Sequence, residues 1–273
     1  MNETQILTAF VCFWLAVFGA VLGSFLDCAV SRWAAGSRDL FAGRSRCDSC
    51  GHTLGAADLV PVFSFLLRRG KCRYCGAKIP ADCLWAELAG AASLACVGLR
   101  FAPALELGHG HWHIGPTLAL VQWVVFAALL LALSLTDAAK RIIPDKLLLA
   151  LAAGRLCCFF AVEADYAAAG LEILKACAIP AVLLALVLGL EKLWGREAMG
   201  GGDIKLLFVL ALYLSWGQLL LTLLGGCLLG ILWAVLARQK QGAALPFGPF
   251  LAAGALLAVC FGGPLLDWYF GLF

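Results

Sequence analysis

Charged residues are scarce in this chain. Only 14% of its 273 residues are Asp, Glu, Lys or Arg, whereas an ordinary soluble domain has about a quarter. Hydrophobic residues make up 63% of the chain, and the mean hydropathy is +0.94. This composition excludes an ordinary soluble domain and predicts a polytopic membrane protein with one small soluble insertion.

Two other features are missing. No basic segment precedes the first apolar stretch, because the first Lys or Arg of the chain is Arg32. A cleavable signal peptide starts with such a segment, so none is expected here. The chain also lacks any glycine-rich fingerprint of a dinucleotide-binding or soluble methyltransferase domain, so a cofactor site cannot be derived from its motifs.

Long apolar stretches recur along the chain, most of them about 17–25 residues long, which is enough to cross roughly 30 Å of hydrocarbon. The sequence therefore predicts an all-α polytopic membrane protein of about eight transmembrane helices. The sixth predicted segment is separated from the seventh only by a tight turn around Ser215-Trp216-Gly217. The predicted segments lie near 6–30, 84–102, 117–136, 146–163, 171–191, 203–216, 217–237 and 248–271.

Positive charge is confined to alternate loops. The loops 31–83, 137–146, 192–205 and 238–247 hold 17 of the 20 Lys and Arg residues, and the loops between them hold none. Basic loops stay on the cytoplasmic side, so this asymmetry predicts an N-terminus outside and the four basic loops inside.

Four cysteines occur in the longest polar interruption, residues 31–83. Cys47 and Cys50 form one C-x2-C pair, and Cys72 and Cys75 form a second, each followed directly by a glycine. Four thiolates at this spacing predict a closed structural zinc site, because a reducing compartment disfavours disulfides and a segment this small needs added folding energy. The sequence thus predicts three units: a first transmembrane segment (1–30), a cytoplasmic zinc-binding domain (31–83) and a transmembrane domain (84–273).

Two aspartates are predicted at the cytoplasmic ends of apolar segments. Asp137 follows the third segment, and Asp203 begins the sixth, directly after three glycines. An acid where a membrane helix begins or ends is costly to maintain, so it is a functional candidate. Each alone could be a helix cap or a solvated loop acid. Together they predict a carboxylate pair that activates water, with glycines that let backbone approach closely.

Several motifs, taken in order, resemble those of type IV prepilin peptidases. The resemblance spans nearly the whole chain, and the GxGD motif together with the double C-x2-C is specific to that family. The matching stretches are Gly23-Ser24-Phe25-Leu26-Asp27, the two cysteine pairs, Leu59–Ser64, Arg69–Arg73, Thr136-Asp137, Ile143-Pro144-Asp145, Gly200–Lys205 and Pro246–Phe250.

The resemblance implies an aspartyl endopeptidase of the bacterial cytoplasmic (inner) membrane that removes the leader from prepilins or pseudopilins. In that reading Asp137 and Asp203 are catalytic, and Gly200 and Gly202 position the substrate. Many members also methylate the new N-terminus with S-adenosylmethionine, which implies a cofactor role for Asp27 and Glu87.

Two departures fall in the half of the family that is associated with methylation. Asp27 stands where the family usually has asparagine, and Asp82-Cys83-Leu84 stands where an Arg-Tyr-Pro run is usual. Neither departure touches the protease motifs. The prediction of methylation therefore rests on a weaker match than the prediction of proteolysis.

Two other functions remain open. A general GxGD intramembrane protease shares the glycine–aspartate motif, although it is not expected to carry the cysteine-rich insertion. A cation channel or transporter could also use membrane acids, but it favours ionisable groups near mid-membrane and internal repeats. The basic residues around Arg69 favour the lipid bilayer as a partner over nucleic acid.

Overall fold

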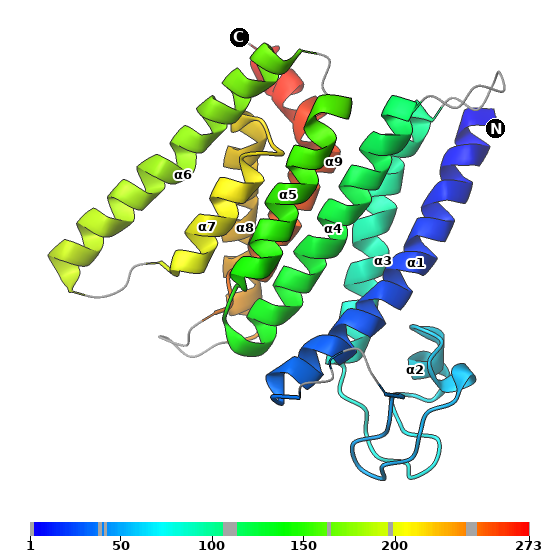
Figure 1. The fold of residues 1–273 in the computed structure, drawn as a ribbon. Coiled ribbons are helices and arrows are strands. Elements are labelled where there is room, and N and C mark those ends of the chain that lie inside the picture. Colours follow the sequence, from blue (N-terminus) through cyan, green and yellow to red (C-terminus); the bar gives the residue numbers. More distant parts are fainter. Residues whose placement is uncertain are drawn as a thin grey trace.

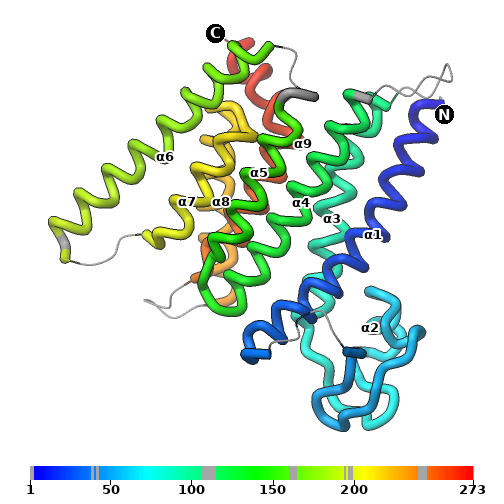
Figure 2. Tube along the Cα trace, in the orientation of Figure 1, coloured from blue at the N-terminus to red at the C-terminus, as the bar shows by residue number. Residues whose placement is uncertain are grey.

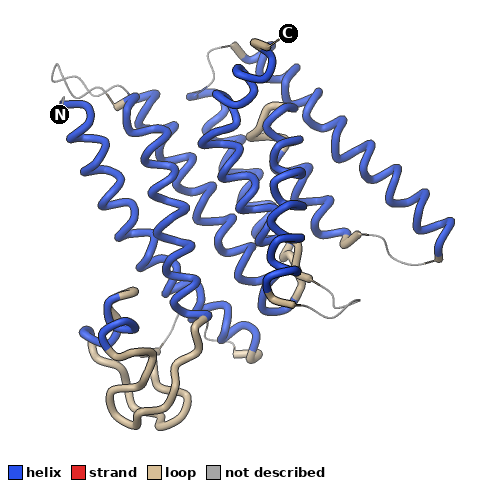
Figure 3. The backbone as a smooth tube through the Cα atoms, turned by 180° about the vertical axis from the view of Figure 1, so that it is seen from behind, coloured by secondary structure: helices blue, strands red, loops and turns tan. Residues whose placement is uncertain are grey.

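The computed structural model describes residues 3–37, 40, 43–105, 114–162, 165–195, 199–238 and 245–272. All regular elements within these ranges are helices, apart from two isolated β-bridges in the segment between the first two long helices (Figure 3). The predicted all-helical class is therefore confirmed.

Eight helices lie at the eight predicted positions. Their bounds are α1 Glu3–Ala34, α3 Asp82–Phe101, α4 Ile114–Lys140, α5 Asp145–Val162, α6 Tyr166–Trp194, α7 Gly201–Leu210, α8 Trp216–Leu236 and α9 Gly248–Phe270. The short elements are η1 Ala56–Asp58, α2 Phe63–Leu67 and η2 Ala102–Ala104. The segment 43–81, called the lobe below, contains η1 and α2.

Six of the described helices are long and apolar enough to cross a membrane: α1, α3, α4, α6, α8 and α9. The other two correspond to the fourth and sixth predicted segments. Helix α5 has 18 residues and carries Asp145, Lys146 and Arg155. Helix α7 has only ten residues, about 15 Å of rise, so it ends well inside a bilayer about 30 Å thick.

Helix α7 can end there because other helices cover it. Leu206, Leu207 and Leu210 are fully buried, and they belong to the main apolar core together with residues of α4, α5, α8 and α9. The turn that follows α7 is therefore not exposed to lipid, where unsatisfied backbone groups would be costly.

Helices α1 and α3 touch through their backbones. A Cβ on Gly19 would overlap the carbonyl oxygen of Gly90, and a Cβ on Gly23 would overlap that of Ala86. Small residues are what allow two membrane helices to approach this closely. The two helices on either side of the lobe are thus held together along a glycine-lined seam.

The lobe lies at one end of the bundle, and both chain termini lie toward the other end (Figure 1). Helices α1 and α4 finish near the lobe's end of the bundle, where α3, α5, α7 and α9 begin. Helix α6 runs along the margin of the bundle, away from α1 and α3 (Figure 2). The ends of α4 and α7 that carry the two candidate acids therefore point the same way as the lobe.

Candidate active site and metal site

Asp137 lies in the last turn of α4, which continues past it to Lys140. Its side chain is buried, with 6% exposed. The backbone N–H of Gly248, at the start of α9, donates a hydrogen bond of 2.9 Å to Oδ2 of Asp137. A Cβ on Gly248 would lie only 2.8 Å from that oxygen. The glycine therefore lets the backbone of α9 reach and orient the carboxylate.

Asp203 lies in the first turn of α7 and is partly buried. Its N–H donates to the carbonyl oxygen of Gly200, the N-cap residue, at 3.1 Å. The carboxylate folds back over the same glycine, because a Cβ there would lie 3.1 Å from Oδ2 of Asp203. Gly200 thus leaves room for the acid.

The turn between α4 and α5 packs against the start of α7. A Cβ on Gly202 would lie 3.2 Å from the Cβ of Ile143. On the next turn of α7, the Lys205 Nζ pairs with Asp145 Oδ1 at 2.8 Å, although both side chains are well exposed. The Ile-Pro-Asp motif therefore serves as a support for α7. An exposed ion pair of this kind contributes little by itself.

Two reciprocal hydrogen bonds hold the other end of α7 to α5. Arg155 of α5 donates from Nε to the carbonyl oxygen of Leu212 at 2.9 Å, and Tyr213 donates from its hydroxyl to that of Leu151 at 2.7 Å. Helix α7 ends inside the bilayer, so the carbonyl group of Leu212 has no helical partner there. The guanidinium of Arg155 supplies its hydrogen bond. Helix α7 is fixed at both ends, which fixes the depth of Asp203.

The two acids are near enough for the charge of Asp137 to act on Asp203. The structure thus brings together the two aspartates that the sequence singles out, on separate helices. It also gives a structural role to Gly248, Ile143 and Lys205, which stood in the matching motifs without an assigned role. Prolines on either side of Gly248 were the available signal, since Pro246 and Pro249 fix the backbone around it.

The four predicted metal ligands also come together. All are free cysteines, and their sulfur atoms lie within 4.8 Å of one another. The sulfurs of Cys47 and Cys75 are 3.9 Å apart. A tetrahedral zinc ion with Zn–S bonds of about 2.3 Å separates its sulfurs by about 3.8 Å, so the cluster fits such an ion.

Each cysteine pair is built on the same turn. Gly51 and Gly76 both have left-handed backbone, with φ of +68° and +71°, and each donates its N–H to the carbonyl of the first cysteine of its pair. Hydrogen bonds from the backbone of Cys50 and Ser49 lower the pKa of the Cys47 thiol to about 7. At Cys75, a hydrogen bond from the backbone of Ala77 is outweighed by desolvation and the other three cysteines, which raise the pKa of that thiol to about 11. A lowered pKa favours the thiolate, which is the form that binds metal.

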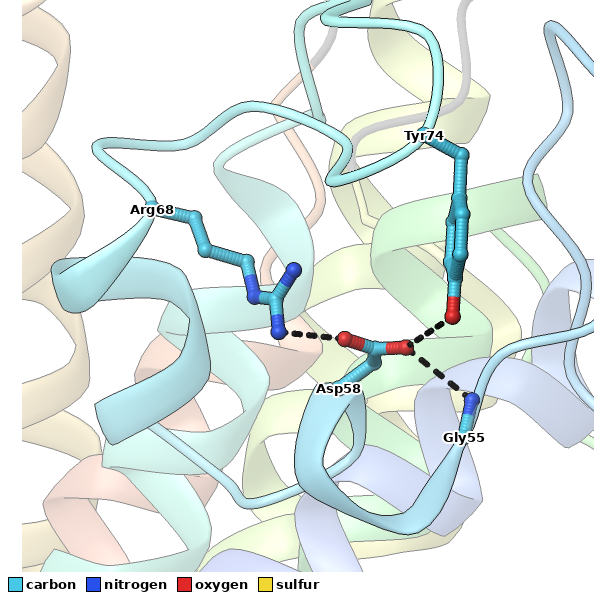
Figure 4. Close-up of polar contacts among 4 residues, drawn as sticks. All are labelled: Gly55, Asp58, Arg68 and Tyr74. Carbon is cyan, nitrogen blue, oxygen red and sulfur yellow. Dashed lines mark hydrogen bonds and ion pairs between the residues drawn. The ribbon is translucent and has the colours of Figure 1, made fainter.

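A carboxylate between the two pairs, that of Asp58, anchors the second pair (Figure 4). Asp58 accepts hydrogen bonds from the Gly55 N–H at 3.0 Å and the Tyr74 hydroxyl at 3.2 Å, and it pairs with Arg68. The hydrogen bond from Gly55, followed by the charge of Arg68, holds the pKa of Asp58 below its usual range. Because Tyr74 lies between Cys72 and Cys75, this network fixes the second pair against the rest of the lobe.

Glu87 connects the lobe to the helices. It is buried in α3, with 5% exposed, and its Oε2 accepts the N–H of Val62 at 2.7 Å. Val62 has φ of +63°, which is unusual for a β-branched residue and marks a constrained joint. Asp27 of α1 lies close enough to interact electrostatically with Glu87 and Asp82. The structure therefore brings both candidate cofactor residues to this joint.

A cavity of about 170 Å³ lies between the lobe and the ends of α1 and α3. Ser24, Cys83 and Glu87 line it from the helices. From the lobe it is lined by several cations, Arg46, Arg68, Lys71, Arg73 and Lys78. The cavity can accommodate part of a small polar molecule next to the carboxylate of Glu87.

Two family models match the chain. One, described as the bacterial peptidase A24 N-terminal domain, matches residues 17–101, and the other, described as the type IV leader peptidase family, matches residues 124–235. No solved structure matches the chain significantly.

Curated relatives match almost end to end. A protein of Aeromonas hydrophila is 33% identical over 93% of this chain and 91% of its own length, and one of Bacillus subtilis is 33% identical over 93% and 96%. A protein of Pseudomonas aeruginosa is 29% identical over 93% and 91%. All three are named prepilin leader peptidase/N-methyltransferase.

Proposed function

The chain belongs to the type IV leader peptidase family, and from this membership we propose that it is a membrane aspartyl endopeptidase that removes the leader of type IV prepilins or pseudopilins. One observation carries the proposal. Asp137, buried near the end of α4 and bonded by the Gly248 N–H, and Asp203, in the first turn of α7, lie at the end of the bundle that bears the lobe, and the charge of Asp137 acts on Asp203. This arrangement is not expected of a cation transporter, whose sites lie near mid-membrane.

Asp137 and Asp203 are proposed to share the chemistry of hydrolysis. One carboxylate removes a proton from water while the water oxygen attacks the scissile carbonyl carbon. The other, protonated, gives its proton to the leaving amine nitrogen as the C–N bond breaks. Such a division needs one proton shared between two interacting acids, as in soluble aspartic proteases. Gly200 and Gly202 are proposed to keep backbone close to this site and so to position the substrate.

The proposed substrate matches the depth of the site. The relatives are named for acting on prepilins, in which a basic leader is expected to precede an apolar helix, so that the scissile bond lies at the membrane boundary. We place that boundary on the cytoplasmic side of the bacterial inner membrane, with the N-terminus outside, because 17 of 20 Lys and Arg residues lie in loops on the lobe's side. We propose that the chain consists of three units: a first transmembrane segment (1–30), a cytoplasmic zinc-binding domain (31–83) and a transmembrane protease domain (84–273).

The cysteine cluster is proposed to bind one structural zinc through Cys47, Cys50, Cys72 and Cys75, which leaves no open position for catalysis. Methylation is proposed as a second activity, because the relatives' names include it. S-adenosylmethionine would supply the methyl group. Glu87, which lines the cavity beside the lobe, and Asp27 of α1, which interacts electrostatically with Glu87, would favour its positive sulfonium.

The test is cleavage of a prepilin co-expressed with the enzyme. We expect Asp137→Asn and Asp203→Asn each to lower cleavage by at least about 100-fold, because a missing general acid or base costs that much. Asp267→Asn is the matched control, since Asp267 is exposed near the other end of α9. Mass spectrometry of the mature N-terminus reports the cleavage site and the methyl group together. Normal cleavage by either aspartate variant would contradict the pair.

A further inference from the structure

The lobe exposes an apolar surface that no described residue covers. It is formed by α2 and the loop that leads into it, residues 59–67, which we call the α2 wedge. Three side chains of α2 point outward, with Phe63 67%, Leu66 59% and Leu67 82% exposed. Leu59 and Val60 add a further 43% and 45%. So much apolar surface on a small polar lobe marks an interaction site.

The inward face of α2 is different. The ring of Phe65 packs on Gly70, where a Cβ would lie 3.1 Å from it, and Ser64 and Phe65 line the cavity beside the metal cluster. The lobe therefore uses one side of α2 for its own packing. Helix α2 is therefore firmly packed on the lobe, and its outward side chains are exposed all the same.

The depth of the α2 wedge can be read from the helix it touches. The span that begins at Asp82 has 23 residues, or about 35 Å, which exceeds a 30 Å core by about 5 Å. Glu87 lies five residues into that helix, about 8 Å along its axis. Val62, which hydrogen-bonds to Glu87, directly precedes α2. The wedge therefore begins at or just inside the edge of the hydrocarbon.

Helix α1 gives the same placement independently. Leu59 and Pro61 border a hollow together with Val21 and Phe25, which lie well inside α1. Figure 1 shows α2 beside the lower part of the α1–α3 pair, while the loops of the lobe project away from the bundle. The wedge thus lies alongside two membrane helices.

Positive charge follows the wedge directly. Arg69 and Lys71 are exposed, whereas Arg68 is engaged with Asp58. Arg69 and Gly70 have left-handed backbone, with φ of +52° and +67°, which turns the chain back after α2. Exposed cations next to apolar side chains suit the boundary between acyl chains and anionic headgroups.

We propose that the α2 wedge inserts into the cytoplasmic leaflet, with Phe63, Leu66 and Leu67 among the acyl chains and Arg69 and Lys71 on anionic phospholipid headgroups. Apolar side chains at this depth, continuous with the lipid-facing surfaces of α1 and α3, favour lipid over a soluble partner. The lobe is then held by the membrane as well as by its two covalent connections and Glu87.

A photo-reactive phenylalanine analogue placed at single positions of the full chain tests this. The protein is reconstituted in nanodiscs of phosphatidylglycerol and phosphatidylcholine, irradiated, and analysed for lipid adducts by mass spectrometry. Position 67 should give lipid adducts. Position 52 should give none above background, because His52 is exposed on the first cysteine turn and stacks on Tyr74.

Adducts of position 67 only with protein, or only with water, would overturn the proposal, as would equal lipid labelling at both positions. A second measurement addresses the charges. Arg69→Gln with Lys71→Gln should reduce the preference of the adducts for phosphatidylglycerol, at unchanged metal content. An unchanged lipid preference would remove the headgroup contact from the proposal.

Discussion

The three glycines before Asp203 have different surroundings. Gly200 lies under the carboxylate of Asp203, and Gly202 lies against Ile143, whereas a Cβ on Gly201 would meet nothing within 4 Å. None of the three has left-handed backbone. The requirement for glycine therefore comes from close packing at the first and third positions and not from backbone strain.

Replacement of these glycines by alanine separates the roles. Gly200→Ala should displace the Asp203 carboxylate and lower cleavage, on the order of 100-fold if the displacement approaches 1 Å. Gly202→Ala should also lower cleavage, because the nearest atom is the Cβ of Ile143, which can move only together with its backbone. Gly201→Ala, one residue away in the same turn, should cleave a prepilin at the normal rate. Initial rates with purified enzymes would measure this, and equal losses in all three variants would argue against it.

Two basic residues show which side-chain partners can be predicted from the sequence. Arg155 and Lys175 both lie inside apolar segments, but only Lys175 has an acid one helical turn away in the sequence, so the partner of Arg155 could not be assigned from the chain. In the structure Arg155 is buried and bonds to the carbonyl of Leu212, whereas Lys175 pairs with Glu172 one helical turn away, and both of those side chains are over 40% exposed. The difference depends on which helix lies opposite, and that is a tertiary property.

Among the helices, α7 is the one whose end could not be predicted from the sequence. Apolar residues run without interruption from Leu206 through the turn at 211–214, so hydropathy gives no signal for the end of the helix at Leu210. The turn is possible only because α5 supplies Arg155 and the surrounding helices exclude lipid. By contrast, the start of α7 was predictable, because glycines and an acid at a helix start have local causes.

The folding of the lobe should depend on bound zinc. Its isolated core is small, and binding of zinc to four thiolates supplies folding free energy. Purified protein should contain one zinc per chain by elemental analysis. Cys47→Ser should lose it and make the lobe sensitive to trypsin, whereas Cys227→Ser, at an exposed position in α8, should lose neither. A metal-free wild-type protein with a resistant lobe would contradict the site.

For the whole molecule, the order of the helices determines the topology in the membrane. If the lobe is cytoplasmic, both termini lie on the opposite side of the membrane. Alkaline phosphatase fused after Leu272 or Leu105 should be active, because that enzyme works only outside the cytoplasm. A fusion after Arg238 should be inactive. The opposite pattern would reverse the proposed orientation and move both aspartates to the outer face. Charge distribution alone predicted this arrangement, because it acts on the chain as a whole.

The glycine-lined seam between α1 and α3 has a consequence for the length of the lobe. Because these helices touch near the joint, at Gly23 and Ala86, the chain leaves and re-enters the bundle at neighbouring points. The entropy of closing a flexible loop rises only with the logarithm of its length, by about 0.6 kcal/mol for each doubling. The bundle therefore exerts almost no thermodynamic selection on how many residues the loop contains. Insertions there should leave the packing of the seam intact, provided that Val62 still reaches the buried carboxylate of Glu87.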